Sequence, residues 1–203
     1  MEVVLVISVV LVAYLLGSIP AGYLLGKLWH VNVLRFASGR TGGTNVLRAA
    51  GPVAGLATGL LDAGKGFLAV WLAGQIADSA LAQSLAGGAV VLGHCYSVFI
   101  GFRGGGGVAT SLGATGAICL PLGLVMTVLL FVVIAVSRIA SVGSLTITTL
   151  LPLILLFMGL VGTLPLTYVL YGVLVWIVII YSHRPNIRRL IAGTERRLGE
   201  PKE

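Results

Sequence analysis

The sequence predicts an all-α polytopic integral membrane protein with seven transmembrane helices, its amino terminus outside and its carboxyl terminus in the cytoplasm. Of its 203 residues, 58% are hydrophobic and only 9% are charged, whereas charged residues make up about a quarter of an ordinary globular chain. The apolar residues form runs of about 20, the length that crosses a bilayer as a helix. A net charge of +7 does not indicate nucleic-acid binding here, because the cytoplasmic loops of membrane proteins collect such charge.

Seven apolar runs define the predicted helices of one membrane-embedded domain, residues 1–203, which ends in a cytoplasmic tail at 182–203. The predicted helices are 3–25, 52–76, 81–100, 108–119, 121–136, 141–160 and 164–181. Pro121 divides the long apolar run in the middle of the chain, because proline lacks a backbone donor and breaks the preceding turn. The first run lacks the basic n-region of a cleaved signal peptide and is expected to remain as a helix.

The basic residues set the expected orientation of these helices. Twelve of the 13 Lys and Arg residues follow the first, third, fifth or seventh helix, and the opposite loops contain none. The positive-inside rule therefore places these 12 residues in the cytoplasm. The exception, Lys65, stands three residues after Asp62 on one helical face, which indicates a buried ion pair at a helix contact or a proton or ion pathway.

Three polar segments fall on the expected cytoplasmic side, at residues 38–48, 101–110 and 181–189. Glycines let backbone amides approach an anion, hydroxyl and amide groups donate to it, and arginine can bind phosphate through two nitrogens. Each segment alone could instead be a packing device or a topology determinant. Together they predict a shared anion pocket, which Ser141 and Ser144 extend from the start of a neighbouring helix.

The residue types in these segments exclude several chemistries. The glycine-rich segment lacks the Lys-Ser/Thr ending of a nucleotide-binding P-loop. None of the six acidic residues lies in the three segments, so neither a paired-carboxylate mechanism nor a serine triad is predicted. His94 and His183 are the candidate bases, and the sequence predicts no metal site. Such a pocket suits an activated substrate, for which positioning and charge stabilisation supply most of the catalysis.

A series of motifs in fixed order covers nearly the whole chain. It comprises GSIP at 17–20, the segment at 38–48, DAGKG at 62–66, GH at 93–94, the glycine-rich segment at 102–110, and His183 with Asn186. In these motifs the chain resembles the bacterial acyl-phosphate:glycerol-3-phosphate acyltransferases, the PlsY family. The resemblance implies a multi-pass enzyme of the bacterial inner membrane, with its active site facing the cytoplasm.

The resemblance also implies the reaction and its participants. The enzyme would transfer an acyl group from acyl phosphate to the 1-hydroxyl of sn-glycerol 3-phosphate, giving lysophosphatidic acid and phosphate in the first acylation step of phospholipid biosynthesis. No cofactor, metal, acyl-CoA or acyl carrier protein is implied. The expected partners are the two substrates, membrane lipid and other phospholipid-synthesis enzymes, and no nucleic acid.

Site residues follow from the resemblance position by position. Ser38 and Arg48 would grip glycerol 3-phosphate, the glycine-rich loop would cradle acyl phosphate, and the donor's own phosphate could accept the hydroxyl proton. The predicted catalytic residues are His94, Arg103, His183 and Asn186. The predicted substrate-binding residues are Ser38, Arg40, Thr41, Gly42, Gly43, Thr44, Asn45, Arg48, Gly104, Gly105, Gly106, Gly107, Ser141 and Ser144.

The chain departs from the family pattern at several positions. The pattern has Asn at Arg40, Ala at Gly43, Pro at Ser97, and Lys-Gly-Gly-Lys-Gly where this chain has RGGGG at 103–107. The second lysine of this pattern is therefore replaced by Gly106, and Arg40 is a candidate to restore the lost positive charge. A transporter for phosphorylated anions and a non-catalytic binding paralogue remain alternatives, although no inverted repeat of the transporter kind is evident.

Overall fold

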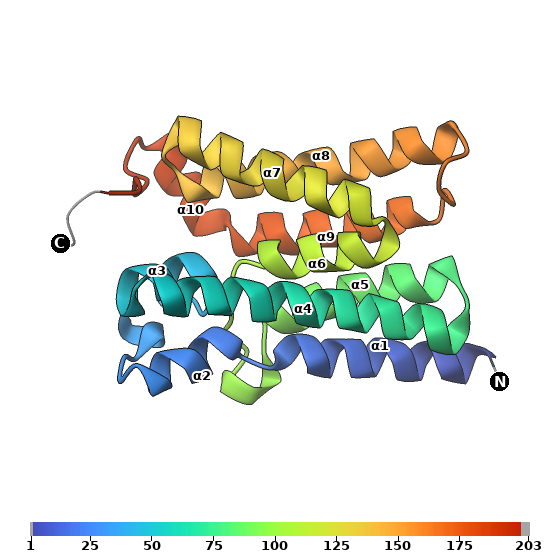
Figure 1. Ribbon diagram of the computed structural model, residues 1–203, viewed down its shortest axis with the longest axis horizontal. Helices are drawn as coiled ribbons and strands as arrows, with labels where there is room; N and C mark the ends of the chain where they lie inside the picture. Colours follow the sequence, from blue (N-terminus) through green and yellow to red (C-terminus); the bar gives the residue numbers. More distant parts are fainter. Residues whose placement is uncertain (1, 200–203) are drawn as a thin grey trace.

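The computed structural model describes residues 2–199, which fold into helices with no strand (Figure 1). An isolated β-bridge joins Ser97 to Arg103. The helices of this part of the chain are α1 (Glu2–Ser18), α2 (Ala21–Leu28), α3 (Gly43–Ala50), α4 (Pro52–Ala77), α5 (Ala80–Cys95), α6 (Val108–Ile118), α7 (Leu120–Ser137), α8 (Ala140–Leu160), α9 (Tyr168–Ser182) and α10 (Arg184–Ile191). Two short 3-10 turns are η1 (Val33–Arg35) and η2 (Val98–Ile100).

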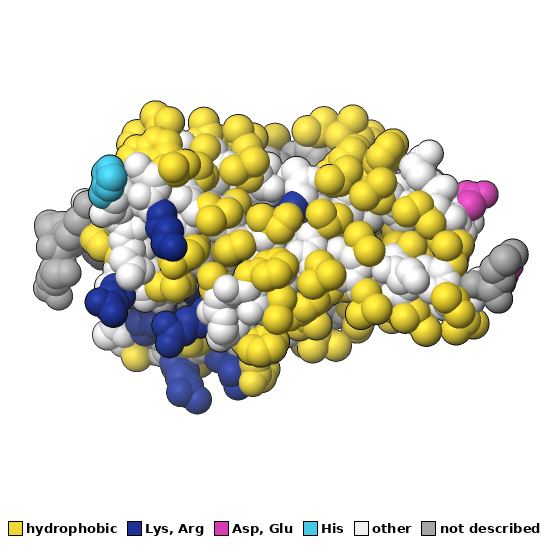
Figure 2. Space-filling view, turned by 90° about the horizontal axis from the view of Figure 1, so that it is seen from below, with side chains coloured by type: hydrophobic (Ala, Val, Ile, Leu, Met, Phe, Trp, Pro, Cys, Tyr) yellow, Lys and Arg dark blue, Asp and Glu magenta, His cyan; other side chains and the backbone are white. Residues whose placement is uncertain are grey.

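The long helices lie side by side along the length of the molecule (Figure 1). Helix α4 packs against α6 and α5, α1 against α5, and α9 against α5 and α8, while α7 bridges α6 and α8. The short helices α2, α3 and α10 gather at one end. Lys and Arg side chains gather at one end of the face shown in Figure 2. Hydrophobic side chains cover most of the rest of this face, the apolar flank of the molecule.

Helices α4 and α6 approach closely because glycines lie at their contact. A Cβ atom at Gly66 would stand 2.0 Å from the carbonyl oxygen of Thr110, and one at Gly113 would stand 1.8 Å from that of Ala63. Neither position has room for a side chain. Small residues at such contacts are typical of helix packing in membranes, where lipid removes the hydrophobic drive for association.

Within residues 2–199, four stretches are long and apolar enough to cross a membrane: α1 with α2, α4, α7 and α8. Helices α9 and α10 form a fifth if this pair, bent by 63°, counts as one span. Helices α5 and α6 are apolar but shorter. The count of seven spans and the orientation of the termini stay predictions.

The structure corrects the first predicted helix, 3–25, which is not continuous. Helix α1 ends at Ser18, and a break at Ile19 and Pro20 precedes α2. Proline cannot donate a hydrogen bond to the preceding turn, and the carbonyl oxygen of Ile19 accepts one from Lys65 Nζ at 2.9 Å. Lys65 Nζ also lies 2.9 Å from Asp62 Oδ1, which confirms the predicted ion pair.

Two other predicted helices are shorter than expected. The helix predicted at 81–100 ends at Cys95, because Tyr96 leaves the helical region with φ −133° and ψ 66°. Gly101 and Phe102, both at positive φ, then turn the chain back beside Ser97. The helix predicted at 164–181 begins only at Tyr168, after a turn that contains Gly162 at positive φ. The predicted tail contains helix α10, and its last four residues, 200–203, lie outside the described part of the chain.

Candidate functional site

A cavity of about 540 Å³ brings the three polar segments together at the end of the molecule that carries α3 and α10. Most of the residues predicted from the sequence line it. They are Ser38, Arg40, Gly42, Gly43, Thr44, Asn45, Arg48, His94, Gly106, Gly107, Ser141, Ser144, His183 and Asn186. The segments at 38–48, 101–110 and 181–189 therefore contribute to one site.

The same cavity continues into an apolar groove between α4 and α7, over α6. Its apolar side chains are Leu56, Leu60, Leu112, Leu130, Phe131 and Ile134. Leu56, Leu60 and Phe131 are 64–67% exposed on the outside of the molecule. Because these side chains face both the cavity and the surface, the groove opens on the apolar flank of the protein.

Asn45 shapes the loop that carries Arg40. Its side chain is buried, and its Nδ2 donates to the carbonyl oxygens of Val33, Phe36 and Arg40 at 2.8–3.2 Å. Its Oδ1 accepts from the backbone amide of Ser38 at 3.3 Å. The side-chain amide thus bonds the backbone between residues 33 and 40 through both its nitrogen and its oxygen, so Asn45 holds the loop in place.

The glycine-rich segment lies directly against His94. The amide of Gly105 donates to the carbonyl oxygen of His94 at 3.0 Å, and a Cβ atom at Gly105 would stand 2.1 Å from His94 Nε2. The amide of Thr41 donates to the carbonyl oxygen of Gly104 at 3.2 Å and joins the first segment to this loop. Thr41, Gly104 and Gly105 support the cavity without lining it, and the exposed Arg103 does not line it either.

His94 has an acidic neighbour that the sequence analysis missed. Its Nδ1 lies 3.3 Å from Oδ1 of the buried Asp62, which also lines the cavity. A carboxylate at Nδ1 favours the proton on that nitrogen and leaves Nε2 facing Gly105. The spacing of Asp62 and Lys65 predicts their ion pair. The contact of Asp62 with His94 joins α4 to α5, and no pattern within either helix predicts it.

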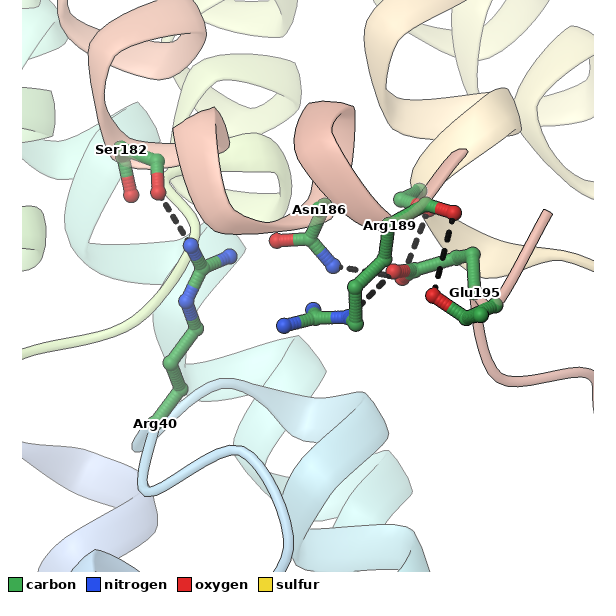
Figure 3. A network of polar contacts seen from close by, with 7 residues as sticks. Arg40, Ser182, Asn186, Arg189 and Glu195 are labelled. Atoms are coloured by element: carbon green, nitrogen blue, oxygen red, sulfur yellow. Dashed lines mark hydrogen bonds and ion pairs between the residues drawn. The ribbon is translucent and has the colours of Figure 1, made fainter. Parts of the chain in front are cut away.

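A second acid, Glu195, also lines the cavity and lies beside Asn186 and Arg189 (Figure 3). Its Oε1 accepts from Ser141 Oγ at 3.0 Å and from Asn186 Nδ2 at 2.6 Å, and its Oε2 accepts from Arg189 Nε at 2.7 Å. Burial opposes ionisation of Glu195, but these three hydrogen bonds outweigh it and hold its pKa below the ordinary value. The spacing of Asn186 and Arg189 places them on one helical face, whereas nothing local predicts the position of Glu195.

Basic, hydroxyl and amide groups thus converge at one end of a cavity whose other end is apolar and opens sideways. Among residues 2–199, no group of three or more His, Cys, Asp or Glu side chains is placed to hold a metal ion. This fold and site define a class of helical membrane proteins whose cavity joins a basic, polar end to an apolar groove.

Comparison with known proteins gives the family within that class. A family model described as glycerol-3-phosphate acyltransferase matches residues 7–193. The chain belongs to the glycerol-3-phosphate acyltransferase family. It is 40% identical over 201 residues to such an acyltransferase of Carboxydothermus hydrogenoformans, covering 98% of this chain and 99% of that one. It is also 40% identical over 193 residues to that of Rubrobacter xylanophilus, covering 95% of each chain.

Solved structures have the same fold. Two crystal structures of PlsY (YgiH), an integral membrane glycerol 3-phosphate acyltransferase, are 36% identical to this chain. The glycerol 3-phosphate form gives a TM-score of 0.86, with 96% of each chain covered. The lysophosphatidic acid form gives a TM-score of 0.85, with 96% of this chain and 95% of the other covered.

Proposed function

We propose that this protein transfers an acyl group from acyl phosphate to the 1-hydroxyl of sn-glycerol 3-phosphate, forming lysophosphatidic acid and phosphate. The observation that carries the proposal is the single cavity with anion-binding groups at one end and an apolar groove at the other. The family and the two ligand forms of the related PlsY structure support the acceptor and the product.

The lining of the cavity suggests how the two substrates are held. Ser38, Arg48, Ser144 and the Ser141–Asn186 wall bind the acceptor phosphate, because hydroxyl, amide and guanidinium groups are its natural donors. The parts of the first and second loops that line the cavity, residues 42–44 and 106–107, cradle the acyl phosphate. The apolar groove then takes the acyl chain.

The reaction needs no cofactor in this arrangement. The acceptor hydroxyl oxygen attacks the acyl carbonyl carbon, the bond from that carbon to the phosphate oxygen breaks, and the departing phosphate takes up the hydroxyl proton. Because the donor is a mixed anhydride, positioning and stabilisation of the developing charge account for most of the acceleration. His94 and His183 form the polar floor beneath the reacting groups.

The proposed location is the bacterial inner membrane, with residues 1–203 forming one acyltransferase domain of seven spans. The amino terminus lies outside, and the site faces the cytoplasm. The gathering of basic side chains at one end of the molecule supports this orientation (Figure 2), and the integral membrane neighbour supports the location.

Phosphate release tests the proposed reaction. Purified protein in lipid vesicles should release phosphate from palmitoyl phosphate only when glycerol 3-phosphate is added, and lysophosphatidic acid should form in equal amount. Arg48→Ala provides the inactive control. Uptake of labelled glycerol 3-phosphate into the vesicles without ester formation would contradict the proposal and indicate a transporter.

A further inference from the structure

We propose that Arg40 and Arg189 together bind one phosphate dianion, held between their guanidinium groups inside the cavity. The two residues come from segments almost 150 positions apart, the loop before α3 and helix α10, and both line the cavity. This inference rests on the proposed function, because the phosphate would be that of a substrate or product of the reaction.

The orientation of Arg189 supports this clamp. Its Nε donates to Glu195 Oε2 at 2.7 Å, so the carboxylate engages the inner nitrogen of the guanidinium group. The terminal nitrogens of Arg189 extend toward Arg40 (Figure 3). Glu195 therefore fixes the direction of Arg189 and leaves its forked end directed into the cavity.

Arg40 approaches the same space from the opposite side. One of its terminal nitrogens donates to the carbonyl oxygen of Ser182, which fixes the side chain across the cavity from its own loop (Figure 3). A Cβ atom at Gly106 would stand 3.7 Å from Arg40 Nη1 and 3.1 Å from His183 Cε1. The missing side chain at position 106 therefore leaves room for the guanidinium group.

Charge explains why an anion belongs between these groups. Burial lowers the pKa of Arg40 and the positive charge of Arg189 lowers it further, while the carboxylate of Glu195 offsets only part of these effects. Of the nearby acids, Glu195 is bonded to Arg189 on the side away from Arg40, and Asp62 is paired with Lys65 and His94. Two facing guanidinium groups repel each other, and a phosphate dianion relieves the repulsion by accepting hydrogen bonds from both.

Inorganic phosphate is the probe for this clamp, and its affinity for the full-length protein in detergent can be measured by calorimetry without either substrate. Arg40→Asn and Arg189→Gln should each weaken phosphate binding by about 10- to 100-fold, the loss expected for a charge-assisted contact. Glutamine at position 189 can still donate to Glu195, so the wall of the cavity is retained. Arg188→Gln, an exposed neighbour on α10, is the matched control and should bind normally.

The double variant tests whether the two residues hold the same ion. Residues that share one ligand are coupled, so Arg40→Asn with Arg189→Gln should lose much less than the product of the two single losses. Unchanged affinity in both single variants, fully multiplicative losses, or an equal loss in Arg188→Gln would each overturn the clamp.

Steady-state kinetics of the same variants identify the source of the phosphate. A raised KM for palmitoyl phosphate with an unchanged KM for glycerol 3-phosphate assigns the clamp to the donor, and the reverse assigns it to the acceptor. The binding assay needs no turnover, so an absence of acyl transfer in the wild-type protein would reject the proposed function and leave the clamp still open to this test.

Discussion

The guanidinium group of Arg40 lies beside Gly106, so that Arg40 Nη1 would be 3.7 Å from a Cβ atom at that position. The resemblance described in the sequence analysis implies a lysine at position 106 and an asparagine at position 40 in related chains. In this chain a positive charge therefore enters the same region of the cavity from another segment. Gly106 is not among the glycines with positive φ, so its backbone can accept a side chain.

Replacing Arg40 by asparagine and Gly106 by lysine should return the positive charge from position 40 to position 106. Arg40→Asn should lower kcat/KM for acyl phosphate by about 10- to 100-fold, since one charge-assisted contact is lost. Adding Gly106→Lys to that variant should recover part of the loss after a small shift of His183. Recovery is measured with palmitoyl phosphate at saturating glycerol 3-phosphate. A folded double variant with no recovery would show that Arg40 does not replace the lysine.

Arg48 should be required for binding of the acceptor. Arg48→Lys should reduce kcat/KM for glycerol 3-phosphate by about tenfold, because lysine keeps the charge but loses the fork that matches a phosphate, and Arg48→Ala should reduce it further. Arg35→Ala, in η1 and not among the residues lining the cavity, is the control. Near-normal turnover of Arg48→Ala at low glycerol 3-phosphate would reject this assignment.

The close contact of α4 with α6 should make Gly66 sensitive to the smallest substitution. Gly66→Ala places a methyl group 2.0 Å from the Thr110 carbonyl oxygen, and overpacking of this kind costs about 1–3 kcal/mol of stability. Gly64→Ala in the same helix meets nothing within 4 Å and should be neutral or stabilising. Thermal unfolding in one detergent compares the two variants, and equal midpoints would contradict the packing argument.

Acidification should loosen the wall formed by Ser141, Asn186 and Arg189. Since the folded-state pKa of Glu195 lies below its ordinary value of 4.5, its ionised form stabilises the fold fully above pH 4.5. This stabilisation is lost as the pH falls through the folded-state pKa. Glu195→Gln should remove that part of the pH dependence of the unfolding midpoint, whereas Asp78→Asn, between α4 and α5, should keep it. An unchanged profile in Glu195→Gln would contradict the role of the carboxylate.

The proposed orientation predicts which side of the membrane each end faces. In a Cys119→Ser background, which leaves only the buried Cys95, Thr194→Cys should react with a membrane-impermeant maleimide only after the cells are opened. Thr163→Cys, in the exposed turn between α8 and α9, should react in intact cells. Labelling of Thr194→Cys in intact cells would overturn the topology.

Local sequence features predict helices better than they predict their interruptions. Pro121 indicates a new helix, and α7 begins next to it, at Leu120. Pro20 also interrupts a helix, but hydropathy stays high across it and conceals the break. The Glu195–Ser141 hydrogen bond joins residues 54 positions apart, and Arg40 meets Gly106 across two segments. Such contacts depend on how helices pack, which neither periodicity nor spacing within a segment records.

The sideways opening of the groove at Leu56, Leu60 and Phe131 has a kinetic consequence. An acyl donor that arrives through this opening diffuses within the bilayer, so its effective concentration is a mole fraction of the lipid. The rate should therefore fall when the donor is diluted with inert phospholipid, even if its amount per volume of suspension stays constant. Glycerol 3-phosphate arrives from water at the basic end. The rate therefore depends on the surface concentration of the donor in the bilayer and on the volume concentration of the acceptor in water.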